Sequence, residues 1–336
     1  MKIAILTPTY SHFSGIDRLV EINTAEYVRQ GHKVMIMCLK ATMKSDKAKV
    51  VQLGMPKSPF FERMYRLLFF LHTAKIDKAV RMLKGYDLVV SHFYPMNIIA
   101  KRAKKLLKIR YQYYNAGVSW PRLFKNPLER LYMQVFTWLS NSTAKGCDEA
   151  ISISNFMREE LLRETGIDSE VKYIPVDKKF NAKVSGKVVR DKYKLGKDPV
   201  LLYLGRISPH KGVHLLIEAY KLAKQKIPGL KLMITGKHTF PAYSRKLKRM
   251  ADEGVIFTGF VADEKLPGLY GACSLYTTAS LWEGYDIPVV EAQACGKKVV
   301  AFDAGSHKEV VKKGLLVKSG DVEGFSKAIV RLLHKI

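Results

Sequence analysis

The sequence contains few acidic residues, few cysteines and no long hydrophobic run. Its 30 Asp and Glu residues stand against 57 Lys and Arg in 336 residues, which gives a formal net charge of +27. The longest strongly apolar stretch, residues 67–71, is flanked by Arg66 and His72 and is far too short to cross a bilayer. With 47% hydrophobic residues and ordinary numbers of glycine and proline, the chain is neither collagen-like nor disordered, and its length predicts two folded domains.

The four cysteines, Cys38, Cys147, Cys273 and Cys295, are widely spaced, with no C-x-x-C pair and no pair of histidines nearby. This spacing argues against both a zinc site and a disulfide framework. We expect reduced, mostly buried thiols, as in a cytosolic protein. The opening residues, 2–6, have the pattern of a strand rather than of a signal peptide, and they favour the same cytoplasmic location.

Nearly half of the excess positive charge lies in residues 40–110, which hold 17 basic and four acidic side chains with aromatic residues between them. Such a charge predicts a polyanionic partner or a lysine-rich surface in water. One interpretation is a basic amphipathic helix that holds the protein peripherally on the anionic inner face of the membrane. The other is a solvated surface. Because no zinc-finger or RNA-binding motif accompanies the charge, we predict no specific nucleic-acid partner.

Short apolar runs alternate with segments of helical periodicity along the chain. Residues 3–7 and 34–39 flank a helical pattern that ends at Gly31, and such a β-α-β unit builds a parallel sheet. Further strands are expected at 87–91, 110–114, 150–154, 200–205, 231–235, 255–258, 274–278 and 298–302, helices at 155–165 and 212–226, and a linker at 177–199. The pattern predicts an α/β fold of two Rossmann-like, doubly wound parallel-sheet domains, 1–178 and 179–336, that face each other across a ligand-binding cleft.

A loop bounded by glycines, 205–212, lies between a predicted strand and a predicted helix. Gly205 and Gly212 permit close approach to the backbone, and the N–H groups at a helix start carry partial positive charge. Arg206 and Lys211 add a forked donor and a point charge, which both suit phosphate oxygens. The segment is therefore either an anion-binding loop or a surface loop with incidental charges.

Two glutamates, Glu283 and Glu291, flank the start of another predicted helix, which has Pro288 in its first turn. Glu291 is placed to accept hydrogen bonds from vicinal hydroxyls such as those of a ribose. The backbone amides of 284–286 would point toward an anion. Two glutamates eight positions apart do not indicate a functional site by themselves, so the interpretation depends on the motifs around them.

That context closely resembles the group 1 (family 4) retaining glycosyltransferases of GT-B fold. The motifs that carry the resemblance are Leu201-Leu202-Tyr203-Leu204-Gly205-Arg206, Lys211-Gly212, Gly236, the run 255–261, Glu283 and the run 291–301. The similarity is strong from about residue 199 to 333. It is weaker, but consistent, at 3–7, Gly15, 31–34 and 150–172.

The resemblance implies that the second domain binds a nucleotide-sugar donor as a co-substrate, with no cofactor and no metal. Arg206 and Lys211 would bind the diphosphate and stabilise the charge that grows on it, while Glu283 would contact donor-sugar hydroxyls; these three are the catalytic candidates. The other donor-binding candidates are Gly15, Gly205, Val261, Gly284, Tyr285, Asp286 and Glu291. Among them, the resemblance assigns the ribose to Glu291, the base to Val261, and to Gly15 an approach to the phosphates from the first domain.

The chain departs from the family pattern at several positions. Ser14-Gly15 occurs where a Gly-Gly pair is usual, and Asp286 stands where glycine is common. Asp286 either hydrogen-bonds a donor hydroxyl and narrows sugar choice, or faces solvent. Asn115 replaces a frequent histidine and cannot shuttle a proton, and His92 resembles another recurrent histidine. These two are acceptor-side candidates, with a structural role as the alternative for His92. Relatives also usually continue beyond residue 333 into a further helix.

The sequence therefore predicts a retaining hexosyltransferase that moves a hexose from a UDP- or GDP-linked donor to an acceptor hydroxyl. The basic segment 40–110 suggests a glycan or lipid-linked acceptor near a membrane, as in the assembly of cell-surface glycans. The alternative is a catalytically inactive module of the same fold that binds nucleotide sugars or polyanions. The departures at Asp286 and Asn115 motivate that alternative.

Overall fold

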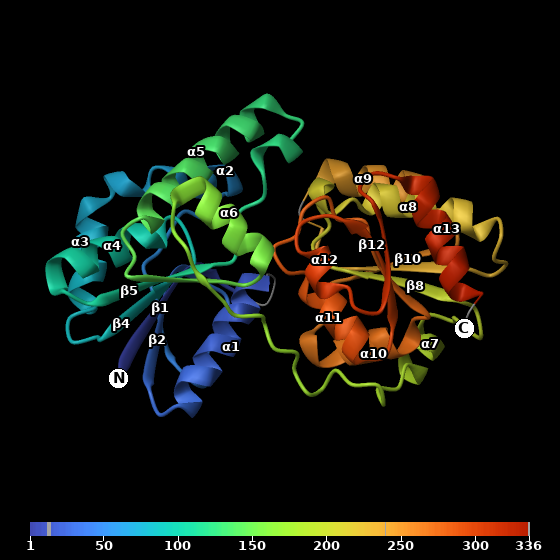
Figure 1. Cartoon of the computed structure of the whole chain (residues 1–336), viewed down its shortest axis with the longest axis horizontal. Helices are drawn as coiled ribbons and strands as arrows, with labels where there is room; N and C mark the ends of the chain where they lie inside the picture. Colours follow the sequence, from blue (N-terminus) through green and yellow to red (C-terminus); the bar gives the residue numbers. More distant parts are fainter. Residues whose placement is uncertain (12–14, 239, 335–336) are drawn as a thin grey trace. The chain divides into compact units, whose positions relative to one another are not determined.

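The computed structural model describes residues 1–11, 15–238 and 240–334. The chain divides into two units, Met1–Tyr173 and Ile174–Ile336, and each unit is built on one parallel β-sheet with helices on both faces (Figure 1). The sequence places the boundary five residues later, at 178/179. The predicted α/β class with two doubly wound parallel sheets is confirmed.

The first unit contains a seven-stranded sheet in the order β3-β2-β1-β4-β5-β6-β7. Its strands are β1 (Lys2–Tyr10), β2 (Lys33–Ala41), β3 (Lys49–Gln52), β4 (Leu88–Ser91), β5 (Arg110–Asn115), β6 (Glu149–Ser152) and β7 (Glu170–Val171). The order reverses between β1 and β4, because the chain builds outward from β1 first in one direction and then in the other. This reversal is a topological switch point, where open α/β sheets bind ligands at the carboxyl ends of the strands.

Helices cover both faces of this sheet. They are α1 (Gly15–Arg29), α2 (Pro59–Leu67), α3 (Thr73–Met82), α4 (Met96–Leu107), α5 (Pro127–Ala144) and α6 (Asn155–Thr165), with short 3-10 turns at Phe69–Leu71 and Pro121–Leu123. Figure 1 shows α1 on one side of the sheet and α3, α4 and α5 on the other. The helix α6 has the predicted bounds, because Ser154 caps its first turn and Gly166 ends it in a left-handed conformation.

The second unit contains a six-stranded sheet in the order β10-β9-β8-β11-β12-β13. Its strands are β8 (Val200–Leu204), β9 (Lys231–Thr235), β10 (Val255–Gly259), β11 (Leu275–Thr278), β12 (Lys298–Asp303) and β13 (Gly314–Lys318). The switch point of this sheet lies between β8 and β11, which pair directly.

The helices of the second unit are α7 (Lys187–Lys192), α8 (Val213–Lys224), α9 (Pro241–Met250), α10 (Leu266–Ala272), α11 (Ile287–Ala294), α12 (His307–Val310) and α13 (Val322–Leu333), with 3-10 turns at Pro209–Lys211 and Asp263–Lys265. Figure 1 shows α8, α9 and α13 on one face of the sheet and α10 and α11 on the other. Among the residues that the structure describes, no helix combines the length and the apolar character that a membrane span requires.

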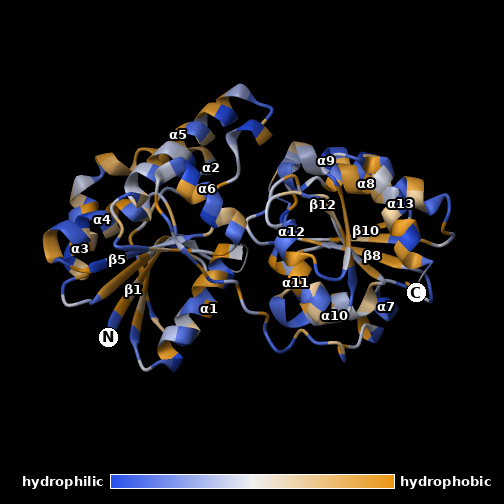
Figure 2. Cartoon of the chain, viewed as in Figure 1, coloured by the Kyte–Doolittle hydropathy of each residue, from blue (hydrophilic) through white to orange (hydrophobic). Residues whose placement is uncertain are grey.

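The central strands are nearly continuous apolar runs, because helices bury both of their faces. Ile3, Ala4, Ile5 and Leu6 on β1 are completely or almost completely buried, and the strand β8 is buried in the same way. Figure 2 shows these strands coloured as hydrophobic in both units. Cys38, Cys273 and Cys295 are buried and Cys147 is half-buried, all as free thiols, as the sequence predicts.

Two sequence expectations about the fold are wrong. The segment 177–199, expected to be a linker, belongs to the second unit: Leu195 is completely buried, and a Cβ on Gly186 would lie 2.2 Å from the backbone nitrogen of Ala272. The strands β3, β7 and β13 were not expected. They are edge or near-edge strands with half-exposed residues, so they lack the long apolar runs that mark the central strands.

Candidate functional site

The candidate site lies at the carboxyl edge of the second sheet, beside its switch point. The loop that follows β8 carries Arg206 and Lys211, and the loop that follows β11 carries Glu283. Because β8 and β11 are neighbouring parallel strands, their carboxyl ends meet at one edge. The topology therefore brings together two loops that are about 70 residues apart in the sequence.

Lys211 and Glu283 form an ion pair at this edge. The ammonium Nζ of Lys211 lies 2.5 Å from Oε1 of Glu283, and the two side chains are 18% and 8% exposed. A lysine ammonium has three N–H donors, so the carboxylate occupies one of them. The pair holds a cation in place with further donors left for an anionic ligand.

Two glycines allow the backbone segments around this pair to approach each other closely. Gly212 has φ +62°, and a Cβ there would lie 1.9 Å from the carbonyl oxygen of Ala279. Gly305 has φ +59°, and a Cβ there would lie 2.2 Å from the carbonyl oxygen of Glu283. Both positions therefore require glycine for its backbone conformation and for its lack of a side chain. The second contact places the turn after β12 directly against Glu283.

The other cation of the loop, Arg206, has an exposed side chain. Between Arg206 and Lys211 lies His210, whose pKa is lowered to about 3 by burial and by the positive charges of Lys211 and Arg206. His210 is therefore neutral at physiological pH, and the positive charge of the loop comes from Arg206 and Lys211. An exposed guanidinium beside a positioned ammonium is an arrangement that suits a diphosphate.

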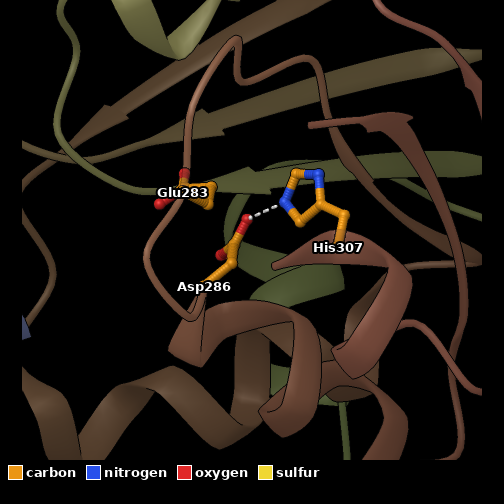
Figure 3. Close-up of side chains that lie close together, drawn as sticks. All are labelled: Glu283, Asp286 and His307. Carbon is orange, nitrogen blue, oxygen red and sulfur yellow. Dashed lines mark hydrogen bonds and ion pairs between the residues drawn. The ribbon is translucent and has the colours of Figure 1, made fainter. Parts of the chain in front are cut away.

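Asp286 pairs with a residue that the sequence analysis missed. Oδ2 of Asp286 lies 2.9 Å from Nε2 of His307 (Figure 3). Nδ1 of His307 lies 2.6 Å from the carbonyl oxygen of Phe302. The expectation that Asp286 faces solvent is wrong, because its side chain is 5% exposed and that of His307 is completely buried. His307 follows the predicted strand 298–302 at the same sheet edge, and that position was the signal available in the sequence.

The surroundings of His307 favour its imidazolium form. A carbonyl oxygen accepts only, so Nδ1–H donates to Phe302, and with Asp286 as a carboxylate the bond between them is donated by Nε2–H. Burial by itself lowers the pKa of His307, but the hydrogen bond and charge of Asp286, the charge of Glu283 and the Phe302 carbonyl outweigh it, so the pKa is raised above 6.5. A buried histidine thus carries positive charge at the site.

Glu283, Asp286 and His307 lie close enough together for one atom of each to reach a single metal ion. One ligand atom from each lies within 4.8 Å of the others. Lys211 and His307 are the cations that face the two carboxyl groups, so two positive and two negative side chains balance here. The turn 305–307 also contacts the loop of Glu283 through its backbone, because the N–H of Ser306 donates to the Glu283 carbonyl at 3.0 Å.

The remaining donor-binding candidates of the second unit all lie at or near this edge. Tyr285 turns its side chain inward, where its hydroxyl donates to the carbonyl of Ile174 at 3.1 Å. Glu291 lies inside α11 as predicted, but it is 1% exposed and its Oε2 accepts from the hydroxyl of Tyr270 at 2.8 Å. Its contact with a ribose stays a prediction. The others are placed as follows: Gly205 directly after β8, Val261 half-buried two residues after β10, and Gly284 buried beside Glu283.

The candidates of the first unit lie at the carboxyl edge of its own sheet. Gly15 is the exposed first residue of α1, while Ser14, its partner in the expected glycine motif, lies outside the described residues. His92 directly follows β4 and is completely buried. Burial lowers its pKa to about 4, against a smaller opposing effect of the Leu6 carbonyl, so it is neutral.

Within the part of the chain that the structure describes, Nε2 of His92 has no hydrogen-bond partner. Asn115, by contrast, is fully engaged in the fold. Its Nδ2 donates to Ser152 at 3.1 Å and to the carbonyl of Met157 at 2.9 Å, and its Oδ1 accepts from the N–H of Gly117. Of the two acceptor-side candidates, His92 therefore keeps an unused polar atom, whereas Asn115 stabilises the connection between β5, β6 and α6.

Two doubly wound parallel-sheet units in one chain, each with loops at a switch point, are the GT-B architecture. The crystal structure of Anabaena Alr3699/HepE in complex with UDP-glucose matches this fold with a TM-score of 0.77 at 20% identity, and the match covers 100% of this chain and 90% of that chain.

Two family models assign the chain further. The model described as Glycosyltransferase Family 4 matches residues 13–176, and the model described as Glycosyl transferases group 1 matches residues 187–335. The chain belongs to the group 1, family 4 glycosyltransferases, as the order of its sequence motifs predicts.

Curated relatives share less than a third of their residues with this chain. The putative glycosyltransferase EpsD of Bacillus subtilis is 28% identical over 267 residues, which are 74% of this chain and 68% of that protein. A GDP-mannose-dependent alpha-(1-6)-phosphatidylinositol monomannoside mannosyltransferase of Mycobacterium tuberculosis is 29% identical over 205 residues, which are 56% of this chain and 53% of that protein. The matches thus span from about half to two thirds of the length of these relatives.

Proposed function

We propose that this glycosyltransferase moves a hexose from a UDP- or GDP-linked donor to an acceptor hydroxyl with retention of the anomeric configuration. The observation that carries the proposal is the Lys211–Glu283 pair beside the exposed Arg206, at the switch point of the second sheet. The two nucleotides are those named for similar proteins, UDP-glucose for the Anabaena structure and GDP-mannose for the Mycobacterium tuberculosis enzyme.

In the proposed reaction, the bond between the anomeric carbon and the diphosphate oxygen breaks, and the nucleoside diphosphate leaves with the electron pair. The sugar passes through an oxocarbenium-like transition state, and the acceptor oxygen bonds to the anomeric carbon on the face that the diphosphate leaves. The departing phosphate oxygen takes the proton of the acceptor hydroxyl. Negative charge therefore grows on the leaving diphosphate, and the most useful protein groups are fixed cations beside it.

Arg206 and Lys211 supply those cations, so the reaction needs no divalent metal for this purpose. Glu283 orients the ammonium of Lys211 and contacts hydroxyls of the donor sugar. Because the ion pair fixes the position of the ammonium, little reorganisation accompanies the growth of charge, and preorganised charges contribute most in a partly buried site. His210 stays neutral and adds no proton transfer at this position.

The family resemblance of these loops supports the other proposed donor contacts. The backbone of Gly205 and of 284–286 faces the diphosphate and sugar, Val261 offers backbone groups to the base, and Glu291 binds the ribose. Asp286 hydrogen-bonds a sugar hydroxyl with the oxygen that His307 does not hold. The family resemblance also supports a role of the Gly15 backbone in phosphate binding and of His92 on the acceptor side.

We further propose that the acceptor is a glycan or a lipid-linked sugar, and that the enzyme works in the cytoplasm, peripherally on the inner face of the membrane. The name of the Mycobacterium tuberculosis relative, which includes a phosphatidylinositol acceptor, and the net charge of +13 in residues 40–110 support this proposal. Anionic lipid headgroups attract such a segment.

A screen of donors tests the proposed function. Thermal shifts with UDP-, GDP- and ADP-linked hexoses identify the donor, and NMR of the product formed with that donor determines the anomeric configuration. We expect stabilisation by a UDP- or GDP-hexose and a product with the donor's configuration. An inverted product would refute the mechanism. Stabilisation by a donor without transfer or hydrolysis across a panel of acceptors would instead support the inactive binding module.

A further inference from the structure

The first unit exposes an unusual amount of apolar surface on α2 and α5. The helix α2 buries none of its residues, and Phe60 and Phe61 are 67% and 61% exposed. On α5, Phe136, Ser140 and Ala144 face inward, while apolar side chains at intervals of three or four residues face solvent. We call the α2–α5 face the set Phe60, Phe61, Met64, Leu68, Leu128, Leu131, Val135 and Trp138, all of which are exposed.

Contacts between side chains place the two helices together. The guanidinium of Arg63 on α2 lies 3.6 Å from the carboxylate of Glu129 on α5, and it also lies 5.8 Å from the centre of the Tyr132 ring. On α5, Tyr132 neighbours Leu128 and Val135 on the helix surface, because residues three or four apart on a helix share a side. Figure 2 shows apolar and polar residues side by side on both helices. The exposed apolar side chains therefore belong to one region.

The charge of this region favours an anionic partner. The segments 57–75 and 121–139, which contain α2 and most of α5, hold seven basic and two acidic residues, a net charge of +5. Lys57, Lys125 and Arg130 are exposed at the borders of the two helices. Aromatic and aliphatic side chains surrounded by basic ones are the composition of surfaces that lie in the headgroup region of anionic bilayers.

The helix α4, the most basic helix of the segment 40–110, does not have this construction. Its apolar side chains, among them Ile99 and Ala103, pack into the core of the first unit. Its basic residues are partly neutralised, because Arg102 lies 2.6 Å from Asp77 and Lys104 lies 2.7 Å from Asp148. A membrane contact through α4 would thus offer few apolar groups and reduced charge.

We propose that the α2–α5 face docks the protein onto an anionic lipid bilayer, with Trp138, Leu128, Leu131, Phe60 and Phe61 inserted among the headgroups. The inference refines the membrane partner of the proposed function and rests on it. It places the contact on a surface whose larger helix, α5, lies outside the basic segment 40–110.

Two weak attractions act together on this face. Trp138 is 65% exposed, and an amphipathic indole ring suits the interface between headgroups and acyl chains. The surrounding basic residues attract the anionic surface, and this attraction weakens as salt screens it. Either attraction by itself gives marginal and reversible binding, so removal of one of them should release the protein.

The test measures co-sedimentation of the full chain with vesicles, without donor or acceptor, so its outcome does not depend on sugar transfer. Vesicles of phosphatidylcholine with about 30% phosphatidylglycerol are compared with pure phosphatidylcholine, at about 0.1 M and about 0.5 M salt. The variant L131S/W138S changes two exposed side chains of the face. The matched control, V188S on α7, changes a side chain that is 79% exposed elsewhere.

We expect binding to anionic vesicles only, weakened in high salt, reduced at least about tenfold in L131S/W138S and unchanged in V188S. Equal binding of L131S/W138S and the unsubstituted protein would overturn the proposal, as would loss of binding on neutralising Lys101, Arg102, Lys104 and Lys105 alone. A third contrary result is a dimer in light scattering that L131S/W138S converts to a monomer, with no vesicle binding. That result would assign the face to a second copy of the chain.

Discussion

The Asp286–His307 pair allows a prediction whose magnitude follows from the structure. The substitution H307N removes the cation that faces the Asp286 carboxylate, in a pair whose side chains are 0% and 5% exposed. Removal of one partner from a buried ion pair costs about 3–5 kcal/mol, because the other charge stays buried without compensation. In a unit of this size 1 kcal/mol corresponds to about 2–4 °C, so the second unit of H307N should unfold about 6–20 °C lower.

A second substitution separates the effect of the unpaired Asp286 charge from the other effects of H307N. Asp286 has φ +57°, which glycine adopts without strain, and D286G also removes the buried carboxyl. The double variant H307N/D286G should therefore recover most of the lost stability, to within about 1–2 kcal/mol of the unsubstituted protein. The two changes are not additive, because each alone leaves one buried charge unpaired.

Calorimetric unfolding measures this difference, and the fluorescence of Trp282, which is 7% exposed in the second unit, assigns the transition. If H307N unfolds within about 2 °C of the unsubstituted protein, or if the double variant unfolds below H307N, the buried pair does not stabilise the unit as argued. Figure 3 shows the side chains that the two substitutions change.

The same variants give a pH dependence with a defined sign. The pKa of His307 is raised in the folded protein above its ordinary value of 6.5, chiefly by Asp286 acting against burial. The stability from this group is therefore fully present below pH 6.5 and is lost as the pH rises through the folded pKa. The difference in unfolding temperature between H307N and the unsubstituted protein should be largest near pH 6 and should shrink in alkaline solution.

Three further predictions concern Glu283, Gly305 and His92. The variant E283Q loses the carboxylate that positions Lys211, so sugar transfer, measured by release of nucleoside diphosphate, should fall about 10²-fold, and the unfolding temperature should also fall because the ammonium of Lys211 loses its partner; unchanged transfer would contradict the role of the pair. The variant G305A places a methyl group 2.2 Å from the Glu283 carbonyl oxygen and should lower both stability and sugar transfer. The control G320A, at a glycine with positive φ but nothing within 4 Å, should lower stability by only about 1 kcal/mol. Equal losses of stability in calorimetry would contradict the role of the close contact at Gly305. Burial lowers the pKa of His92 to about 4, so between pH 6.5 and 4 the unfolded chain binds a proton that the folded protein does not bind. The free energy of unfolding should therefore fall by up to about 1.4 kcal/mol per pH unit over this range, and that of H92F should fall less steeply. Parallel plots of stability against pH for the two proteins would exclude this cause.

Apolar periodicity and the order of the motifs predict much of the fold and the centre of the site. The strand β9 and the helix α6 have the predicted bounds, because a buried strand and a capped helix leave clear local patterns. The meeting of Lys211 and Glu283 also follows from the sequence, because both residues lie in the loops that follow strands which a doubly wound sheet makes neighbours.

The features that sequence reasoning missed depend on what lies opposite a side chain in space. His307 has no motif of its own, and Asp286 is a departure from a family pattern until its partner is known. The apolar stripe of α5 has the same periodicity whether it faces a core or solvent, so only the structure places Leu131 and Trp138 on the surface. The edge strand β13 alternates between exposed and half-buried residues, so its sequence does not show the apolar pattern of a buried strand.

The most direct test of the central claim compares turnover of K211A and R206A with that of the unsubstituted enzyme, with the donor that the screen identifies. K221A, which removes an exposed lysine of the neighbouring helix α8, serves as the control. We predict that K211A and R206A each lose about 10²–10³-fold in kcat and that K221A is unaffected. R206A changes an exposed side chain and should keep its unfolding temperature, whereas K211A leaves the buried carboxylate of Glu283 without its partner and should unfold at a lower temperature while staying folded under assay conditions. Sugar transfer at the normal rate by both K211A and R206A would contradict the claim that these cations stabilise the departing diphosphate.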